Sequence, residues 1–314
     1  MSELPLALFL MGPTASGKTA LSLKIAEYFP IEIISVDSAL VYREMDIGTS
    51  KPDKKTRDKY AHHLIDICDP AEAYSAAQFR NDAMAAMENI VERGKVPLLA
   101  GGTMLYFRAL SQGLSELPAA NPEVRAKLDQ FLSEKGSQAL HERLRKIDPE
   151  AAAKIHPNDP QRLQRAVEVF EISGVPISEW WKKESTHTLP FELIKFALNT
   201  QDRSTLHHRI ENRFVEMLDE GLVDEVEKLR LRNDLNLNKP SMRAVGYRQV
   251  WQYLDGELSY DEMIHKGVVA TRQLAKRQLT WLRSETELQW IYSNQKNFVE
   301  IALKKLEKIP KLIG

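Results

Sequence analysis

Short, mainly apolar runs recur along the chain, each bounded by polar residues or glycine. They cover residues 6–11, 31–36, 96–100 and 194–198. Runs of this length are typical of strands that are buried on both faces of a parallel sheet. Segments with helical spacing, 18–29 and 76–93, lie between the first three runs. The order strand, helix, strand, helix, strand predicts a doubly wound α/β fold.

Strand patterns disappear between about 118 and 190, where charged amphipathic segments replace them. One of these segments has clear helix boundaries, with Asp159 as N-cap, Pro160 at the first helical position and Gly174 as the stop. The sheet pattern then returns, followed by helices and a short strand at 290–292. We therefore expect a core made of residues 1–118 and 190–314, and an all-helical insertion domain at 119–189.

The loop after the first predicted strand fits the G-x-x-x-x-G-K-[ST] pattern, between a strand and a helix as that motif requires. Its glycines let backbone N–H groups converge on phosphate, Lys18 adds a positive charge, and the Thr19 hydroxyl can bind Mg²⁺. The motif predicts a P-loop NTPase-like sheet, and an ordinary strand-to-helix turn is the alternative. The residues expected to bind phosphate are Gly12, Pro13, Thr14, Ala15, Ser16, Gly17, Lys18 and Thr19.

Two further strand ends fall on the same edge of the predicted sheet. Asp37 follows the second strand, and a glycine pair with Thr103 follows the third. Ligands of such sheets bind at the carboxyl ends of the strands. Asp37 is a candidate to hold metal, hold substrate or accept a proton, and the alternative is a turn cap with Ser38. A hydrolytic NTPase usually has a second aspartate that binds the metal ion, and Asp66 matches it only weakly. The sequence therefore favours a small-molecule kinase over a hydrolytic motor.

Basic residues recur at helical spacing after the fourth predicted strand. Arg209 and Arg213 are four residues apart and hence on one helix face. Such a pair is suited to neutralise a diphosphate leaving group. The alternative is a pair of surface salt bridges to Glu211 and Glu216.

Glutamine and arginine are mixed in three further segments. Residues 161–165 read QRLQR, 271–283 read TRQLAKRQLTWLR, and 243–248 hold two arginines. Amides and guanidinium groups beside aromatic residues such as Tyr247 and Trp251 suit a looped or single-stranded RNA, whose bases stack and form hydrogen bonds. Each segment alone is equally well a solvated surface.

Composition narrows these interpretations. The 314-residue chain has a net charge of -1, which excludes a wholly basic nucleic-acid coat but not a local basic face. Its apolar runs are too short to cross a bilayer and no signal peptide is evident, so we expect a cytoplasmic protein without membrane contact. Cys68 is the only cysteine, and histidine pairs at 62–63 and 207–208, taken as neighbours on helices, do not share a face. We therefore expect no zinc site.

Several segments together resemble the tRNA dimethylallyltransferases, the bacterial tRNA isopentenyltransferase family. From about residue 6 to 290 they read GPTASGKT, ISVDSALVYREMDIGTSKP, HHLIDI, GGTMLYFRAL, HPNDPQRLQRAVEV, RAVGYRQVW and TRQLAKRQLTWLR. The resemblance implies transfer of a dimethylallyl group from dimethylallyl diphosphate to N6 of the adenosine 3′ of the tRNA anticodon, with Mg²⁺ as cofactor and release of diphosphate. The helical insertion is then expected to bind the anticodon stem-loop.

The resemblance also implies roles for individual residues. Asp37 would accept the proton of the adenine amine, with Thr103 near the base. Lys18, Thr19 through Mg²⁺, and Arg213 or Arg209 would stabilise the departing diphosphate. The residues implied for tRNA contacts are Asp37, Ser38, Ala39, Leu40, Thr103, Arg125, Gln161, Arg162, Leu163, Gln164, Arg165, Arg243, Tyr247, Arg248, Arg272, Gln273, Lys276, Arg277 and Gln278.

Three other functions stay open at the level of the sequence. A kinase of a small metabolite would use the same loop with ATP and would be indifferent to RNA. A non-catalytic RNA-binding protein would use the loop to grip backbone phosphates. A prenyltransferase of free adenine nucleotides shares the chemistry, but the long insertion and its Gln-Arg face favour a macromolecular acceptor.

Overall fold

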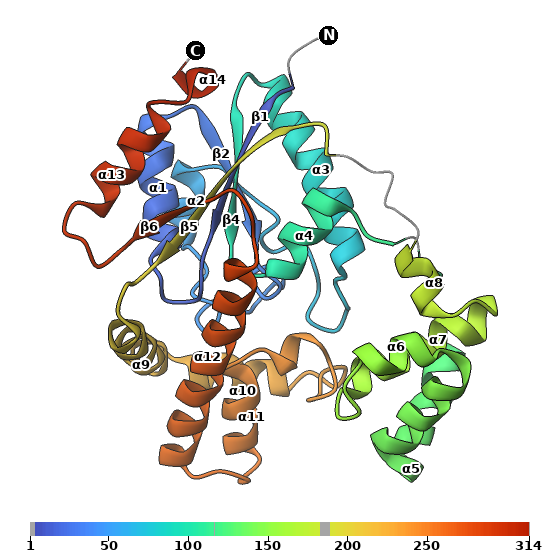
Figure 1. The fold of residues 1–314 in the computed structure, drawn as a ribbon. Coiled ribbons are helices and arrows are strands. Elements are labelled where there is room, and N and C mark those ends of the chain that lie inside the picture. Colours follow the sequence, from blue (N-terminus) through green and yellow to red (C-terminus); the bar gives the residue numbers. More distant parts are fainter. Residues whose placement is uncertain (1–3, 116, 183–188, 314) are drawn as a thin grey trace. The chain divides into compact units, whose positions relative to one another are not determined.

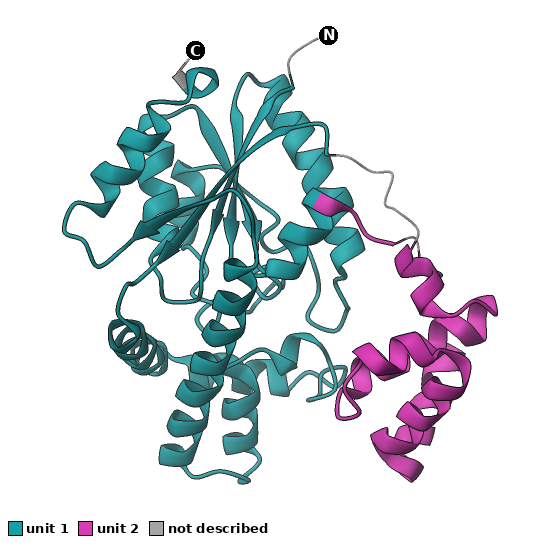
Figure 2. Cartoon of the chain, in the orientation of Figure 1, with its two compact units in different colours: residues 1–111, 189–314 teal, residues 112–188 magenta. Residues whose placement is uncertain are grey.

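The computed structural model describes residues 4–115, 117–182 and 189–313. The chain forms two compact units, coloured separately in Figure 2: Met1–Ser111 with Leu189–Gly314, and Gln112–Thr188. The second unit begins at Gln112 rather than at the expected 119, because α4 (Met104–Gln112) ends there. Each unit has buried hydrophobic clusters of its own.

A parallel sheet of six strands within the described residues forms the centre of the first unit (Figure 1). The strands are β1 (Leu6–Met11), β2 (Ile31–Val36), β3 (His62–His63), β4 (Val96–Gly101), β5 (Glu192–Asn199) and β6 (Leu288–Tyr292). Their order is β3-β2-β4-β1-β5-β6, and every pairing is parallel. The predicted α/β fold and its five predicted strands are confirmed. The sequence predicts no strand at β3, because two residues are too few to show a pattern.

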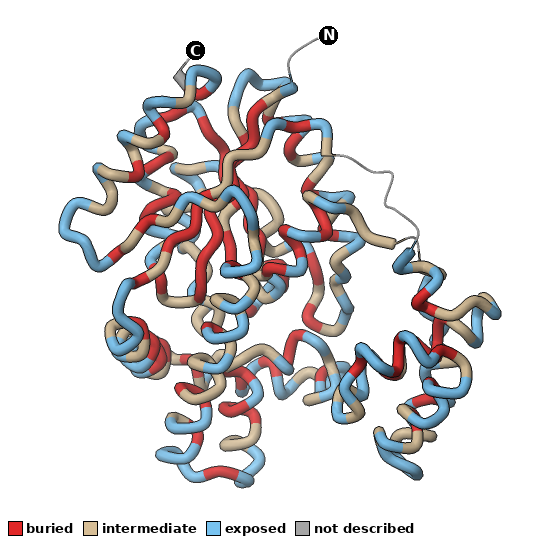
Figure 3. The backbone as a smooth tube through the Cα atoms, viewed as in Figure 1, coloured by how far each residue is buried: buried red, intermediate tan, exposed pale blue. Residues whose placement is uncertain are grey.

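Helices cover both faces of this sheet, and β1 and β2 are buried along their whole length (Figure 3). On one face, α3 (Ala76–Glu92) and α4 pack against β1, where the Phe9 and Phe107 ring centroids are 4.9 Å apart. On the other face, α1 (Lys18–Tyr28) and α13 (Phe298–Leu306) pack against Leu8 and Leu10 of the same strand. Because successive side chains of β1 point to opposite faces of the sheet, this strand contributes to two separate hydrophobic cores. The short helices of this unit are α2 (Lys54–Lys59) and α14 (Pro310–Ile313).

Four helices gather at the end of the sheet where the strands terminate: α9 (Arg203–Asp219), α10 (Leu222–Arg230), α11 (Tyr247–Leu254) and α12 (Tyr260–Arg283), with a 3₁₀ turn at Ser241–Arg243. Gly267 lets α12 lie close against α9, since a Cβ there would be 2.3 Å from the Phe214 ring. Although α12 has 24 residues, neither it nor any other helix in the described ranges is apolar enough to cross a membrane.

The second unit is helical in its described residues. Its helices are α5 (Pro122–Ile147), α6 (Pro149–Lys154), α7 (Pro160–Ser173) and α8 (Ile177–Lys182). The predicted boundaries of α7 are confirmed: the Asp159 carboxylate accepts from the Arg162 N–H, Pro160 is the first helical residue, and Gly174 ends the helix with φ of 69°.

The two adjacent histidines at 62 and 63 lie in the edge strand β3, so the premise that they occupy a helix is wrong. His63 Nε2 lies 2.7 Å from Glu32 Oε2, and His62 Nδ1 lies 2.7 Å from the Tyr60 carbonyl oxygen. Both imidazoles therefore have protein partners. In the ranges that the structure describes, no three His, Cys, Asp or Glu side chains are grouped so as to hold a metal ion.

The single cysteine, Cys68, is buried and pairs with Tyr42 in an isolated parallel bridge. Its Sγ lies 3.6 Å from a carboxylate oxygen of Glu72. Burial, followed by the hydrogen bond to Glu72, raises the pKa of this thiol to about 11. The Cys68 side chain is therefore a neutral thiol that packs in the core.

Candidate active site

A cavity of about 190 Å³ lies at the carboxyl ends of β1, β2 and β4. Its walls come from the loop after β1, from Asp37 after β2, from the Gly101–Gly102 pair at the end of β4, and from α9 and α12. The three strand ends that the sequence singles out therefore meet at one site. This is the position at which α/β sheets bind their ligands.

Glycines shape the loop between β1 and α1. Gly17 has φ of 96°, in the left-handed region that favours glycine. Gly12 has no room for a side chain, since a Cβ there would be 2.4 Å from the Leu198 carbonyl oxygen. The loop residues that line the cavity are Thr14, Ala15, Lys18 and Thr19. Because α1 starts at Lys18, the helix N-terminus also faces this side of the sheet, as anion binding requires.

Lys18 has no carboxylate within ion-pair distance among the described residues, and its Nζ donates to the Pro13 carbonyl oxygen at 2.7 Å. Burial lowers the pKa of Lys18 to about 7, although the nearby charge of Asp37 acts to raise it, and Arg213 lowers it further. The Ser16 hydroxyl in the same loop is buried without a hydrogen-bond partner in the described structure. An ammonium group and a hydroxyl that lack strong partners fit an anionic ligand.

Asp37 uses its two carboxylate oxygens differently. Oδ1 accepts hydrogen bonds from the N–H groups of Ala39 at 2.8 Å and Leu40 at 3.4 Å, so Asp37 does cap the turn that follows β2. No bond to Oδ2 is found among the described residues, and Asp37 lines the cavity. One oxygen therefore fixes the side chain while the other is left for a ligand. The carboxylate also acts to raise the pKa of Arg213 against the larger, opposite effect of burial.

Thr103 follows β4 but does not belong to the cavity wall. Its Oγ1 accepts a hydrogen bond from the Ser38 N–H at 3.0 Å. Gly101 permits this close approach of the two strand ends, since a Cβ at Gly101 would be 2.0 Å from the Val36 carbonyl oxygen. Thr103 thus ties the turn that carries Asp37 to β4, rather than projecting into the cavity.

The two arginines of α9 lie in different places. Arg213 lines the cavity and is half-buried, and its Nε donates to Ser50 Oγ at 2.8 Å. Arg209 is not part of the cavity wall, since its guanidinium binds Ser293 Oγ at 2.8 Å and the Ser293 carbonyl oxygen at 3.2 Å. Of the two arginines expected near a diphosphate, the structure thus brings Arg213 and not Arg209 to the cavity. The four-residue spacing places both on one helix side, but their long side chains diverge.

Gln278 of α12 joins two of the strand ends. Its Oε1 accepts a hydrogen bond from the Thr14 N–H at 2.9 Å, and its Nε2 donates to the Gly102 carbonyl oxygen at 2.8 Å. Gly102 is required for this contact, because a Cβ there would be 2.4 Å from Nε2. Gln278 is expected to contact RNA, and in this structure both ends of its amide are bound to the phosphate loop and to the turn after β4.

The predicted RNA-contact residues of the first unit fall into two groups. Tyr247 is fully buried and donates its hydroxyl to Glu225 Oε1 at 2.5 Å, and Trp251 is also buried. The expectation of an aromatic stacking surface there is wrong, because both rings fill the core between α10, α11 and the segment after β2. Arg272 is paired with Glu211 at 3.0 Å. The side chains that stay exposed without an ion pair to another described residue are Arg243, Arg248, Gln273, Lys276 and Arg277.

In the second unit, Leu163 is fully buried, so its predicted RNA contact is wrong: the middle of QRLQR faces the helical core. Arg125 Nε and Arg165 Nη1 bind Glu168, at 2.9 Å and 2.6 Å, and the Glu168 side chain is fully buried. Burial alone would raise the pKa of Glu168, but the hydrogen bonds from both arginines lower it overall. These two arginines therefore neutralise the buried carboxylate of Glu168.

The rest of this segment is bound locally or exposed. Arg162 pairs with Asp159 at 3.4 Å, and Gln164 donates to Asp129 at 2.7 Å. Gln161 is exposed.

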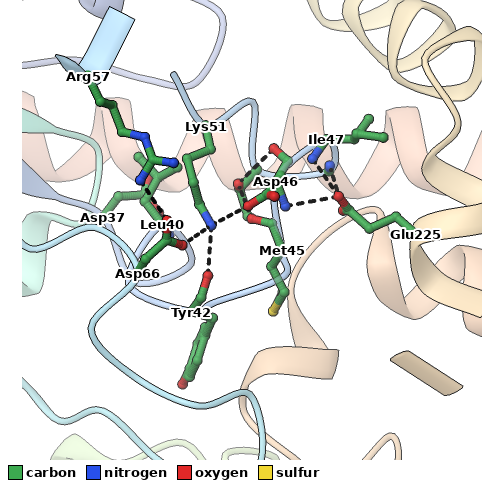
Figure 4. Close-up of polar contacts among 12 residues, drawn as sticks. Asp37, Leu40, Tyr42, Met45, Asp46, Ile47, Lys51, Arg57, Asp66 and Glu225 are labelled. Carbon is green, nitrogen blue, oxygen red and sulfur yellow. Dashed lines mark hydrogen bonds and ion pairs between the residues drawn. The ribbon is translucent and has the colours of Figure 1, made fainter. Parts of the chain in front are cut away.

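The segment after β2 holds polar residues whose function the sequence does not reveal (Figure 4). Asp66, the weak metal candidate, is bound by Lys51 at 2.5 Å and Arg57 at 2.6 Å, so both of its oxygens already have cationic partners. Thr49 and Ser50 line the cavity beside Arg213. Both belong to ISVDSALVYREMDIGTSKP, and the family resemblance of that segment is the signal by which they could have been found.

The fold and the site together define a P-loop protein whose cavity suits a phosphate-bearing ligand. The family model described as IPP transferase matches residues 40–285. That range is most of the chain, and the protein belongs to the IPP transferase family.

Three solved structures are similar over almost the whole chain. The tRNA isopentenylpyrophosphate transferase of Bacillus halodurans is 38% identical, with 96% of each chain covered and a TM-score of 0.69. The tRNA delta(2)-isopentenylpyrophosphate transferase of Staphylococcus epidermidis is 32% identical over 97% of this chain and 99% of its own, with a TM-score of 0.69. A eukaryotic dimethylallyltransferase acting on tRNA is 26% identical over 96% of this chain and 78% of its own, with a TM-score of 0.80.

Proposed function

We propose that the protein transfers a dimethylallyl group from dimethylallyl diphosphate to N6 of the adenosine on the 3′ side of the tRNA anticodon. The observation that carries this proposal is the open Oδ2 of Asp37 in a cavity shared with Lys18 and Arg213, in a chain of the IPP transferase family. A carboxylate beside two cations suits a reaction in which a proton leaves the acceptor while an anion leaves the donor.

The reaction joins the adenine N6 to the first carbon of the dimethylallyl group. The bond from that carbon to the bridging oxygen breaks, and diphosphate leaves with the electron pair. The proton lost from N6 passes to Asp37, whose Oδ1 is fixed by the turn amides. The loop N–H groups, Lys18 and Arg213 stabilise the charge that develops on the diphosphate oxygens.

Mg²⁺ is the cofactor that fits this donor set. The Thr19 hydroxyl lines the cavity in the first turn of α1 and is a hard oxygen ligand. Mg²⁺ commonly binds one or two protein oxygens together with substrate phosphates and water, so a larger protein cage is not needed. When bound, the ion would neutralise diphosphate charge, and the Thr19 hydroxyl would hold it, which leaves the open oxygen of Asp37 to accept the proton.

A macromolecular acceptor is favoured over a free nucleotide by the exposed cations of α12 and of the segment around α11. Arg243, Arg248, Lys276 and Arg277 are exposed without an ion pair to another described residue. Phosphate contacts of this kind supply much of the affinity for nucleic acid. We also infer that the helical unit, 112–188, binds the anticodon stem, and that the protein works in the cytoplasm, where tRNA is available.

A labelling assay tests the proposal. The protein is incubated with Mg²⁺, dimethylallyl diphosphate labelled in the hydrocarbon, and either unmodified tRNA or AMP. We expect label in tRNA, at N6 of the adenosine beside the anticodon, and none in AMP. Label in AMP alone would assign the nucleotide prenyltransferase, and an ATP-dependent product without RNA would assign a kinase.

The Asp37→Asn variant tests the proton acceptor. Asparagine keeps an oxygen that can accept from Ala39, so the turn is preserved, but it cannot take a proton. We expect kcat to fall by about 10²–10⁴-fold with tRNA affinity nearly unchanged. Asp219→Asn, at an exposed position on α9, is the matched control and should leave kcat unchanged. An Asp37→Asn enzyme with wild-type turnover would rule out this role.

A further inference from the structure

The carboxylate of Glu225 on α10 is held by backbone groups from a distant part of the chain. Oε2 accepts from the N–H groups of Asp46 at 3.0 Å and Ile47 at 2.8 Å, and Oε1 accepts from Gly48 at 3.2 Å. Figure 4 shows the Glu225 side chain pointing toward this segment, residues 46–48, which we call the bend. The hydroxyl of Tyr247 adds a fourth donor at 2.5 Å. One side chain thus binds three consecutive N–H groups and a phenol.

Gly48 makes this arrangement possible. A Cβ at Gly48 would be 2.5 Å from the Tyr247 ring and 2.8 Å from a methyl carbon of Leu222, so the backbone lies directly against the ring. Tyr247 is fully buried, and its ring and hydroxyl therefore both fix the 46–48 backbone. We refer to Glu225 and Tyr247 as the clamp.

The next residues, Thr49 and Ser50, form part of the cavity wall. Ser50 has φ of 50°, a conformation that a residue with a side chain rarely adopts, so surrounding contacts must hold it. Its N–H donates to the Ile47 carbonyl oxygen at 2.9 Å, inside the clamped bend. On the other side, the ammonium of Lys51 is buried and binds the Tyr42 carbonyl oxygen and the carboxylates of Asp46 and Asp66. Ser50 is therefore fixed from both directions.

Arg213 takes its orientation from this wall. Its Nε donates to Ser50 Oγ at 2.8 Å, and Nη2 donates to the Thr49 carbonyl oxygen at 3.4 Å. Arg213 has no carboxylate within ion-pair distance among the described residues, so the hydrogen bonds that fix its guanidinium come from neutral groups. Neutral partners orient the cation without cancelling its charge, which leaves that charge for a ligand in the cavity.

We propose that Ser50 is a positioning residue for Arg213, and that the clamp acts on the reaction by holding Ser50. This inference rests on the proposed role of Arg213 in stabilising the leaving diphosphate. A misdirected guanidinium would be farther from the developing charge, and small displacements of a preorganised group reduce the rate of the chemical step more than substrate binding.

Four single variants test this series of contacts. Ser50→Ala removes the acceptor of Arg213, and Ser50→Gly does so while relieving the positive φ. Glu225→Gln places an amide N–H₂ where only acceptors fit, and Tyr247→Phe keeps the ring but loses the hydroxyl. We expect kcat to fall about tenfold for Ser50→Ala, Ser50→Gly and Glu225→Gln and a few-fold for Tyr247→Phe, as removal of one to two hydrogen bonds predicts. KM for dimethylallyl diphosphate should change less than kcat. Glu227→Gln, exposed on the same helix, is the control and should match the wild type.

A double-mutant cycle distinguishes positioning from a general loss of structure. Each variant is combined with Arg213→Ala, and kcat is measured for all combinations. If Ser50 and the clamp act through Arg213, the second change should reduce kcat by less than twofold in the Arg213→Ala background. Full additivity would overturn the inference. If Arg213→Ala alone has wild-type kcat, it is the proposed role of Arg213 that fails. Should Arg213→Ala be impaired while the Ser50 variants keep wild-type kcat, only the positioning proposal fails.

Discussion

Two stretches of nearly the same composition, QRLQR on α7 and RQLAKRQ on α12, use their charges in different ways. On α7, Arg165 joins Arg125 in binding the buried Glu168, and Leu163 faces the core. On α12, Lys276 and Arg277 are exposed without an ion pair to another described residue.

The difference shows that a cation must be judged by what already neutralises it. An arginine bound to an internal carboxylate supports the fold, whereas a cation with only neutral partners, or none, keeps its charge for a ligand. Lys18 and Arg213 meet the second condition inside the cavity, because their partners in the described structure are carbonyl and hydroxyl oxygens.

The largest effect is expected from breaking the internal pair. Arg165→Ala leaves Glu168 buried with one of its two cations removed, which should lower the free energy of unfolding by about 3 kcal/mol. Chemical denaturation followed by circular dichroism measures the change. Arg145→Ala, which removes an exposed pair with Glu142, should cost less than about 1 kcal/mol. Equal destabilisation of the two variants would contradict the comparison.

Removing the exposed cations of α12 should weaken tRNA binding without changing the stability of the fold. The double variant Lys276→Ala, Arg277→Ala should keep its unfolding free energy but bind tRNA about tenfold or more weakly near physiological salt. The slope of log affinity against log salt should fall by about two, one for each phosphate that the variant no longer neutralises. Filter binding over a series of salt concentrations measures both quantities. Lys304→Ala on α13 is the control, and an unchanged slope in the double variant would place the RNA elsewhere.

Gln278 sharpens the comparison, because it lies in the α12 stretch but binds protein rather than solvent. Gln278→Leu removes both hydrogen bonds, to Thr14 and to Gly102, and should raise KM for dimethylallyl diphosphate by about tenfold or less. Its affinity for tRNA should stay within twofold of the wild type. Steady-state kinetics and filter binding separate the two. A selective decrease in tRNA binding would restore the interpretation of Gln278 as an RNA-binding residue.

The smallest effect concerns the proton on Lys18. Burial lowers its pKa to about 7, so above that pH the ligand-free side chain is mostly neutral, and binding of the diphosphate should take up a proton. Donor affinity should therefore decrease as pH rises from about 7.5 to 9, by less than tenfold per unit. Calorimetry in two buffers with different heats of ionisation counts the proton. Lys18→Arg, which stays protonated, should abolish the uptake, and uptake that persists in this variant would assign the proton to another group.

The same shift affects stability without ligand. The unfolded chain binds a proton at Lys18 up to its ordinary pKa of 10.5, whereas the folded chain releases it near 7. The free energy of unfolding should therefore increase as pH rises from about 7 to 10.5, because the unfolded chain binds more protons than the folded chain in this range.

The strands and the phosphate loop were accessible from the sequence because they depend on local patterns. Four apolar runs and one spaced glycine motif place the site at the edge of the sheet. Burial of Tyr247 and the partners of Glu225 were not accessible, since the bound residues are far apart in the chain and an aromatic residue beside arginines looks the same in a core or on a surface. The distinction between Arg209 and Arg213 depends on which way two long side chains turn, and helical spacing carries no such information.

The state of Cys68 has a practical consequence for following RNA docking by spectroscopy. A thiol that is buried, and whose pKa is about 11, reacts slowly with maleimides at neutral pH. The natural sequence can thus carry one introduced cysteine, for instance Lys304→Cys or Gln273→Cys, and accept a fluorophore at that position alone. A fluorophore at position 273 on α12 would then report RNA binding without a contribution from labelled Cys68.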